Sequence, residues 1–328
     1  MLSKATNRWR AYRQSPRYED KKSELFNGSK SFLLSVFRAI LIIGISYVIL
    51  APIIGIVSRS FFSDADAINP IVFTIPMQPT LERYERAMVH LDYWHTTLNT
   101  MFYTVALTAI QVVICSMVGY GFARFQFPLK KVWFACVVIM IVIPSHTIML
   151  PLYMTFKQFD PLGIVSAITG GPINLMNSTT PIYVMTALGC GLRSGLYIYI
   201  FNQFFRGLPK EIEEAAFVDG AGTWYTYFRI MLVNAMPAVI TVTVFSLVWQ
   251  YNDTFMARLF NVPSDVLVSK KLATLQNNIA VLDKILNVRL QELYVNAGVV
   301  LVMLPIVILY LVLQRRFIEG VERSGIVG

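Results

Sequence analysis

A cluster of polar and aromatic residues interrupts an apolar stretch in the last third of the sequence. It consists of Trp249, Gln250, Tyr251, Asn252 and Asp253. An aromatic ring can stack on the apolar face of a sugar ring, while amides and a carboxylate can pair with its hydroxyl groups. The cluster therefore predicts binding of a polyhydroxylated ligand. Because a helix distributes neighbouring side chains around its axis, about two of the four residues before the acid are expected to reach a cavity.

Two ionisable residues are expected at similar depths in apolar segments. Arg193 lies thirteen residues before Arg206, and Asp253 lies sixteen residues after Pro237. With Arg206 and Pro237 at the cytoplasmic boundary, a rise of 1.5 Å per residue gives depths of about 20 and 24 Å. The matched depths predict an Arg193–Asp253 ion pair. Such a pair is either a scaffold that neutralises two costly charges, or part of a gate or of a site that holds sugar hydroxyl and carboxylate groups.

His146 lies between Pro144 and Pro151 in another apolar segment. Prolines bend a helix and leave carbonyl groups free, so this stretch is expected to border a cavity. No second metal ligand lies at helical spacing from His146, which favours a packed or cavity-lining donor. The cysteines also lie in apolar segments without CxxC spacing, which favours packing thiols over a disulfide or a zinc site: Cys115, Cys136 and Cys190.

The composition places these residues in a membrane. Hydrophobic residues make up 55% of the 328 residues and charged residues only 14%, with a mean hydropathy of +0.57. In an ordinary soluble domain, roughly a quarter of the residues are charged. Segments long enough to span the bilayer predict six transmembrane helices near 35–61, 98–121, 132–156, 182–206, 237–260 and 294–314. The first begins too late and runs too long for a cleaved signal peptide, so it is expected to remain as an anchor.

The distribution of lysine and arginine predicts the orientation. Residues 1–33 carry eight of them and residues 122–131 carry three, whereas residues 62–97 have two against five acids. Both termini are therefore expected in the cytoplasm, although five basic residues in 258–293 weaken the bias. The net charge of +9 is spread over these flanks, which indicates contact with lipid headgroups and no nucleic-acid partner.

A polar segment at 207–236 separates the fourth and fifth apolar segments. Pro209 suits a first helical turn, and the acids that follow are favoured there by the helix dipole: Glu211, Glu213 and Glu214. Ala215 and Ala216 keep one side slim enough to enter a groove. Gly220 permits the left-handed conformation that ends a helix, and Thr223 is placed to cap a second one. The segment predicts a helix-turn-helix on the cytoplasmic face; the alternative is a solvated amphipathic connector.

This pattern of Glu-Ala-Ala, three residues, glycine, nine residues and Ile-x-Leu resembles the EAA motif of permease subunits of ATP-binding-cassette (ABC) importers. Further stretches are similar to the carbohydrate-importing, maltose-type branch of that family: Asn99-Thr100, Tyr120-Gly121-Phe122-Ala123-Arg124-Phe125, Phe127-Pro128, Ile143-Pro144 and Leu150-Pro151-Leu152-Tyr153. Three features depart from the family pattern. Val233 replaces an expected proline, the tail glycines Gly320, Gly325 and Gly328 are unevenly spaced, and residues 1–33 have no clear counterpart.

The resemblance implies an all-α integral membrane protein with six transmembrane helices and the type I ABC importer permease fold. The expected organisation is a basic cytoplasmic arm at 1–33, a permease domain at 34–320 and a cytoplasmic tail at 321–328. The resemblance also implies a location in a bacterial or archaeal cytoplasmic (inner) membrane. Within the permease domain, it implies a cytoplasmic coupling helix in 207–236. The residues expected to couple to an ATPase are Glu213, Glu214, Ala215, Ala216, Asp219 and Gly220.

The expected partners follow from the same resemblance and from one absent motif. The sequence has no G-x-x-x-x-G-K-[ST] loop, so it cannot be an ATP hydrolase, and no catalytic triad or paired carboxylates stand out. No cofactor is expected on this chain, with ATP and Mg²⁺ held by a partner. The resemblance implies a second, unlike permease, two ATPase subunits and an extracytoplasmic binding protein. Residues 80–84 and 93–95 are expected to form either a rim for that binding protein or a structural cap.

Two alternatives remain open from the sequence. The solute is an oligosaccharide or related carbohydrate, including an acidic one that would suit Arg193, or it is a non-sugar such as a phosphorylated polyol or a polyamine. In the other alternative the chain is a self-sufficient secondary transporter or a membrane receptor, and 207–236 is only a connector. Inverted repeats with two broken helices would favour that alternative, and the sequence indicates a single proline-broken span.

Overall fold

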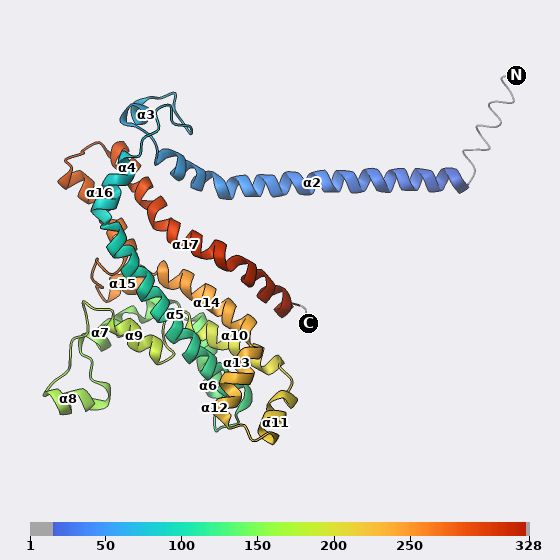
Figure 1. Ribbon diagram of the computed structural model, residues 1–328, viewed down its shortest axis with the longest axis vertical. Helices are drawn as coiled ribbons and strands as arrows, with labels where there is room; N and C mark the ends of the chain where they lie inside the picture. The colour runs from blue at the N-terminus through green and yellow to red at the C-terminus, as the bar shows by residue number, and fades with distance from the viewer. Residues whose placement is uncertain (1–15, 326–328) are drawn as a thin grey trace. The chain divides into compact units, whose positions relative to one another are not determined.

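The computed structural model describes residues 16–325, with side chains described over 32–312 and at Gln314. The chain divides after Arg59 into two units (Figure 1). The first unit contains α2, Pro16–Arg59, so the predicted first span begins inside one long helix that already includes the second half of the predicted basic arm. Predictions for residues 1–15 and 326–328 lie outside the described residues.

The second unit is helical, and its only described β-type pairing is an isolated bridge between Phe159 and Ile173. In chain order, its first helices are α3 Asp64–Ile68, α4 Glu82–Leu91, α5 Tyr93–Arg124, α6 Lys130–Val142, η1 Ser145–Ile148, α7 Met149–Lys157, η2 Pro161–Gly163 and α8 Ile164–Thr169. They are followed by α9 Thr180–Ala187, α10 Ser194–Gly207, α11 Glu211–Val218, α12 Thr223–Tyr225, η3 Thr226–Met231, α13 Leu232–Asn234, α14 Met236–Tyr251, α15 Phe255–Leu259, α16 Val268–Leu282 and α17 Val288–Gly325.

Helix α5 is the centre of the packing in this unit. It lies along α10 and α14, and α14 in turn packs against α17. The α5–α10 contact is close because Gly119 has no side chain: a Cβ atom there would lie 2.6 Å from the Cβ of Phe201 and 3.0 Å from the backbone nitrogen of Asn202. Small residues at such a crossing let two membrane helices approach and gain dispersion contacts. The core beside this crossing includes the buried Tyr197 and Phe205.

The membrane-spanning segments are less regular than the sequence predicts. Within the described residues, three helices are long and apolar enough to cross a membrane unbroken: Phe32–Arg59, Tyr93–Arg124 and Val288–Val312. Two bent pairs raise that number to five when each pair is counted as one span. Lys130–Val142 meets Ser145–Lys157 at 105°, and Thr223–Asn234 meets Met236–Tyr251 at 78°. The exact number of six spans stays a prediction.

The fourth predicted span is not one continuous helix. It is divided into α9 and α10 by residues 188–193, in which Gly189 and Arg193 have left-handed φ angles of 72° and 61°. A Cβ at Gly191 would lie 2.6 Å from Oγ1 of Thr186, so the chain folds tightly back on α9 at this point. This interruption contains no proline, so it is a broken span in addition to the proline-broken one that the sequence indicates. Arg193 itself directly precedes α10.

Candidate functional site

The predicted cytoplasmic helix is present as α11, and its ends differ slightly from the prediction. It begins at Glu211 after Lys210, so Pro209 lies before the first turn and not within it. Gly220 has a φ of 84°, the left-handed conformation predicted for it. The cap of the next helix is Gly222, whereas Thr223 is its first residue and provides no side-chain cap.

Glu213 joins α11 to the cytoplasmic end of α5. One carboxylate oxygen, Oε2, lies 3.1 Å from Nε of Arg124, and the other accepts a hydrogen bond from the hydroxyl of Tyr120. Arg124 also donates from a terminal nitrogen to the backbone oxygen of Leu208 at 2.9 Å. The Glu213 side chain is 11% exposed and that of Arg124 only 6%. Glu213 thus holds the helix in place and does not face outward, a role that sequence reasoning missed.

The outward surface of α11 is formed by other predicted coupling residues. Glu214, Ala215, Asp219 and Gly220 are exposed, and Ala216 is buried beneath them. No described residue forms an ion pair with Glu214. Beyond the turn the surface continues with three exposed aromatic side chains: Trp224, Tyr225 and Phe228. The surface therefore combines a free carboxylate with apolar area, which suits insertion into a groove of another protein.

The segment after α11 continues as a distorted helix. Residues Thr226–Met231 form a π-helical turn, and Leu232–Asn234 follow as one α-helical turn before the bend into α14. Val233, which replaces the expected proline, is within this last turn and is half exposed. The 78° bend itself lies at Ala235, between this turn and α14, and Pro237 is in the first turn of α14. A π-helical turn and a proline are both known causes of a change in helix direction.

A cavity of about 540 Å³ lies at the breaks that follow α6 and α14 and precede α10. It brings together five of the seven residues predicted for a substrate pathway: His146, Arg193, Trp249, Asn252 and Asp253. Its wall is completed by the end of α6, the linker to η1 and the start of α15. The breaks in the helices are what place side chains from distant segments in one cavity.

Arg193 and Asp253 line this cavity without forming the predicted ion pair. The ion pairs of the described residues include none between them. The guanidinium carbon of Arg193 instead lies 4.4 Å from the centroid of the Trp249 ring, a cation–π arrangement. Asp253 directs its Oδ1 to the backbone N–H groups of Phe255 and Met256, both at 3.1 Å. The depth estimate failed as a pairing rule because Asp253 lies beyond the end of α14, where its side chain accepts from the first turn of α15.

The carboxylate of Asp253 can accept more hydrogen bonds than the described residues donate to it. The residue is 6% exposed, and its Oδ2 has no hydrogen-bond partner in the described part of the chain. A buried carboxylate oxygen without a donor is costly. A ligand hydroxyl is the kind of donor that would satisfy it. Together with the cation at Arg193 and the amide of Asn252, the cavity can recognise a ligand that has both hydroxyl and anionic groups.

Two predicted pathway residues point away from the cavity. The amide of Gln250 donates to Oε1 of Gln111 at 3.1 Å, and the hydroxyl of Tyr251 donates to the backbone oxygen of Val302 at 2.7 Å. The expectation that about two of the four aromatic and amide residues reach a cavity agrees with this geometry, since Trp249 and Asn252 do. Helical periodicity alone explains which pair is lost.

Gln111 is a buried residue that the sequence analysis missed. Its amide nitrogen donates to the backbone oxygen of Leu192 at 2.6 Å and to Oγ of Ser194 at 3.0 Å, and its oxygen accepts from Oγ of Ser246 at 2.8 Å. One side chain of α5 therefore fixes both the break before α10 and the wall formed by α14. A glutamine in the middle of an apolar segment was the signal that could have identified it.

His146 borders the cavity beside an aromatic ring. Its imidazole lies 4.8 Å from the ring of Phe255, and it is exposed. No three of the described His, Cys, Asp and Glu residues lie close enough together to hold a metal ion. The geometry thus places His146 on the cavity wall, as the prolines on either side predict.

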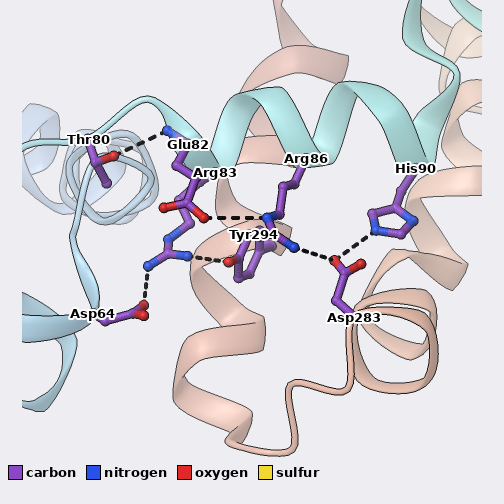
Figure 2. Close-up of polar contacts among 8 residues, drawn as sticks. All are labelled: Asp64, Thr80, Glu82, Arg83, Arg86, His90, Asp283 and Tyr294. Carbon is purple, nitrogen blue, oxygen red and sulfur yellow. Dashed lines mark hydrogen bonds and ion pairs between the residues drawn. The ribbon is translucent and has the colours of Figure 1, made fainter.

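A separate polar cluster joins the outer helices of the second unit (Figure 2). Arg83 of α4 is 2% exposed; it contacts Asp64 and the hydroxyl of Tyr294, and its guanidinium lies 4.4 Å from the Tyr294 ring. Asp283 binds His90 at 2.9 Å and Arg86 at 3.7 Å. These contacts fasten α4 to α17 and to the end of α16. They support the structural cap that was one of the two alternatives for residues 80–84.

Comparisons with known proteins relate the chain to a family of transport components. Residues 111–323 match the family model described as binding-protein-dependent transport system inner membrane component. A diacetylchitobiose uptake system permease from Streptomyces coelicolor is 23% identical over 88% of both chains. An arabinooligosaccharides transport system permease from Halalkalibacterium halodurans is 25% identical over 87% of this chain and 93% of the relative.

A solved structure has the same fold. A bacterial ABC transporter involved in the import of the acidic polysaccharide alginate contains a chain that superposes with a TM-score of 0.72 at 21% identity, over 88% of this chain and 98% of the other. The match confirms the all-α fold of an ABC importer permease.

Proposed function

Because this chain belongs to the family of binding-protein-dependent transport system inner membrane components, we propose that it is a permease subunit that carries an oligosaccharide or related carbohydrate across the cytoplasmic membrane. The solute is delivered by an extracytoplasmic binding protein. The chain is paired with a second, unlike permease, and two ATPase subunits hold the ATP and Mg²⁺. The single observation that carries the proposal is the exposed Glu214 surface of α11 on a chain that shares this family's fold.

Transport in this proposal is alternating access driven from α11. Nucleotide binding closes the ATPase dimer, and α11 moves with the groove that holds it. The Glu213–Arg124 contact passes the movement to α5, and Gln111 on the same helix is bonded to the wall of the cavity. Both termini lie on the cytoplasmic side, where α11 meets the ATPase. The chain itself binds and moves the solute and catalyses no reaction.

Replacement of Glu214 by alanine tests the docking surface. We expect the assembled transporter to lose ATPase stimulation by the sugar-loaded binding protein, because a charged interface contact that is truncated costs roughly 2–5 kcal/mol. The assay is ATP hydrolysis by the reconstituted complex during a screen of oligosaccharides. Glu211→Gln is the matched control, since Glu211 lies on the same helix and is also exposed. Hydrolysis and transport by Glu214→Ala at the rate of the unmodified complex would contradict the proposal.

The cavity at the helix breaks is the proposed position of the solute during passage. Trp249 offers a ring face, Asn252 an amide, and Asp253 a carboxylate oxygen without a donor in the described chain. Arg193 has no carboxylate partner among the described residues either, so its charge is available to an anionic group. This chemistry favours a carbohydrate that carries acidic groups over a polyamine, whose positive charges Arg193 would repel.

Replacement of Arg193 by glutamine tests whether the solute is acidic. We expect uptake of an acidic oligosaccharide to fall by roughly 10- to 100-fold, because a hydrogen bond to a charged group contributes about 1.5–3 kcal/mol. A neutral oligosaccharide should lose far less. Uptake into vesicles that contain the complete transporter measures both. Arg258→Gln is the control, because Arg258 is an exposed cation of α15 that does not line the cavity. An equal loss for both sugars would assign Arg193 a purely structural role.

A phosphorylated polyol is the second candidate solute. The observation that favours it is the same guanidinium beside hydroxyl-binding groups, since a phosphate pairs with arginine as a carboxylate does. The oligosaccharide screen separates the two candidates when a phosphorylated polyol is included. A self-sufficient secondary transporter is set aside, because the family to which the chain belongs depends on a binding protein.

A further inference from the structure

A second cavity lies between the end of α5, the start of α6 and the end of α10. Its volume is about 860 Å³. None of the described residues that line it is acidic. Five of them are cationic: Arg124, Lys130, Lys131, Arg206 and Lys210. The function proposed above leaves this cavity without an assigned role. Its charge indicates an anionic ligand.

Most of these charges have no counter-ion in the described part of the chain. Arg124 is paired with Glu213. Lys130 donates to the backbone oxygen of Phe125 at 2.8 Å, which leaves its charge uncompensated. Lys131, Arg206 and Lys210 are exposed and form no ion pair with any described residue. Like charges that are gathered around one concave surface raise the local potential and attract anions.

The start of α6 adds to this positive potential. Leu129 precedes the helix with a φ of 58°, no side chain caps the first turn, and the first turn contains no acid. The N–H groups of Lys130, Val132 and Trp133 already donate to backbone oxygens, so the contribution of this helix start is the positive end of the helix dipole, which favours a negative charge. The helix start alone would not make a site. In this cavity it lies beside four uncompensated cations.

The cavity also has an apolar wall. The centroid of the Phe122 ring lies 5.6 Å from that of Phe127 and 5.5 Å from that of Phe134. All three rings line the cavity. A free anion gains nothing from aromatic rings, whereas the glycerol and acyl groups of a lipid pack against them. The segment lies at the end of a membrane-spanning helix, where basic residues meet lipid headgroups.

We propose that this cavity binds the phosphate group of an acidic phospholipid. The phosphate lies among Lys131, Arg206 and the start of α6, and the lipid's apolar part packs along Phe122 and Phe134. A soluble phosphate is the other source of the same chemistry. Because Arg124 both lines the cavity and pairs with Glu213, the bound lipid lies directly beside the contact that holds α11.

The test measures lipid binding to the complete transporter, so it does not depend on the identity of the solute. The complex is reconstituted in phosphatidylcholine vesicles that contain phosphatidylglycerol, extracted in detergent, and analysed for retained phosphatidylglycerol by mass spectrometry. We expect Lys131→Gln with Arg206→Gln to retain roughly 10- to 30-fold less, since each basic residue near the surface contributes about 1 kcal/mol. The control is Lys284→Gln with Arg289→Gln, two exposed cations outside the cavity.

Inorganic phosphate distinguishes the two sources. If phosphatidylglycerol stays bound in its presence and is lost only from the Lys131/Arg206 variant, the ligand is the lipid. If no lipid is retained but inorganic phosphate binds to the unmodified complex and not to that variant, the site takes a soluble phosphate and the lipid assignment is overturned. Equal retention by the variant and the unmodified complex, or an equal loss in the control, overturns the site altogether. Both cations are exposed, so the variant should fold.

Discussion

Glu213→Gln should release α11 from α5 and abolish coupled transport, although Glu213 does not belong to the exposed surface proposed to dock on an ATPase. The substitution leaves the charge of Arg124, whose side chain is only 6% exposed, without a partner. Loss of one member of a buried ion pair costs about 3–5 kcal/mol. We expect faster amide hydrogen exchange throughout α11 and weaker retention of the ATPase subunits when the complex is purified.

A double-mutant cycle separates this effect from simple damage. Arg124→Gln should be as harmful as Glu213→Gln, and the double variant should be less harmful than the sum of the two, because contacting residues are not additive. Glu211→Gln, on the exposed part of the same helix, is the control. If Glu213→Gln exchanges and assembles like the unmodified chain, the anchoring role is wrong.

Gly119→Val should prevent α5 and α10 from packing. Even the first carbon of a side chain would lie 2.6 Å from the Cβ of Phe201 and 3.1 Å from the backbone oxygen of Ile198. Backbone atoms cannot rotate away, so the helices must separate. We expect alanine to cost about 1–3 kcal/mol and valine more. Thermal unfolding in detergent and the yield of folded protein measure the effect.

The neighbouring glycine provides a matched control for this prediction. A Cβ at Gly121 would meet no described atom closer than 4.0 Å, the Cδ2 of Phe125. Gly121→Ala should therefore leave the unfolding temperature nearly unchanged or raise it slightly, because alanine also favours the helix. Equal destabilisation by the two alanine variants would mean that helix propensity or lipid contact, and not the crossing, determines the result.

Local features of the chain were predictable from the sequence. The Glu-Ala-Ala run, its acids at the start and Gly220 at the end predicted α11 to within a few residues, because capping and helix dipoles act over one turn. The alternation of ring, amide and acid at 249–253 likewise predicted a cavity wall. Helical geometry determines which of these side chains face elsewhere. From the sequence, about two of the four residues before Asp253 are expected to reach a cavity, and two do.

Long-range features were not predictable in the same way. The partner of Glu213 lies 89 residues earlier in the chain, at Arg124, and no local pattern indicates that pairing. The break before α10 was missed because the turn lies among apolar residues, so the apolar character of the segment gives no sign of an interruption. The dense glycines Gly189, Gly191 and Gly195 were the available signal. The Arg193–Asp253 pair was wrong for a related reason, since the depth estimate assumed unbroken helices.

The anchoring of α11 determines which parts of such a protein can be exchanged with a relative. Although α11 follows α10 in the chain, its buried carboxylate is fastened to Tyr120 and Arg124 of α5. A chimera that receives only the docking helix of another permease would therefore lose the matched ion pair between that helix and α5. The exchangeable module is therefore discontinuous: it comprises residues 207–236 together with residues 120–124, and engineered transporters with a substituted ATPase should carry both segments or neither.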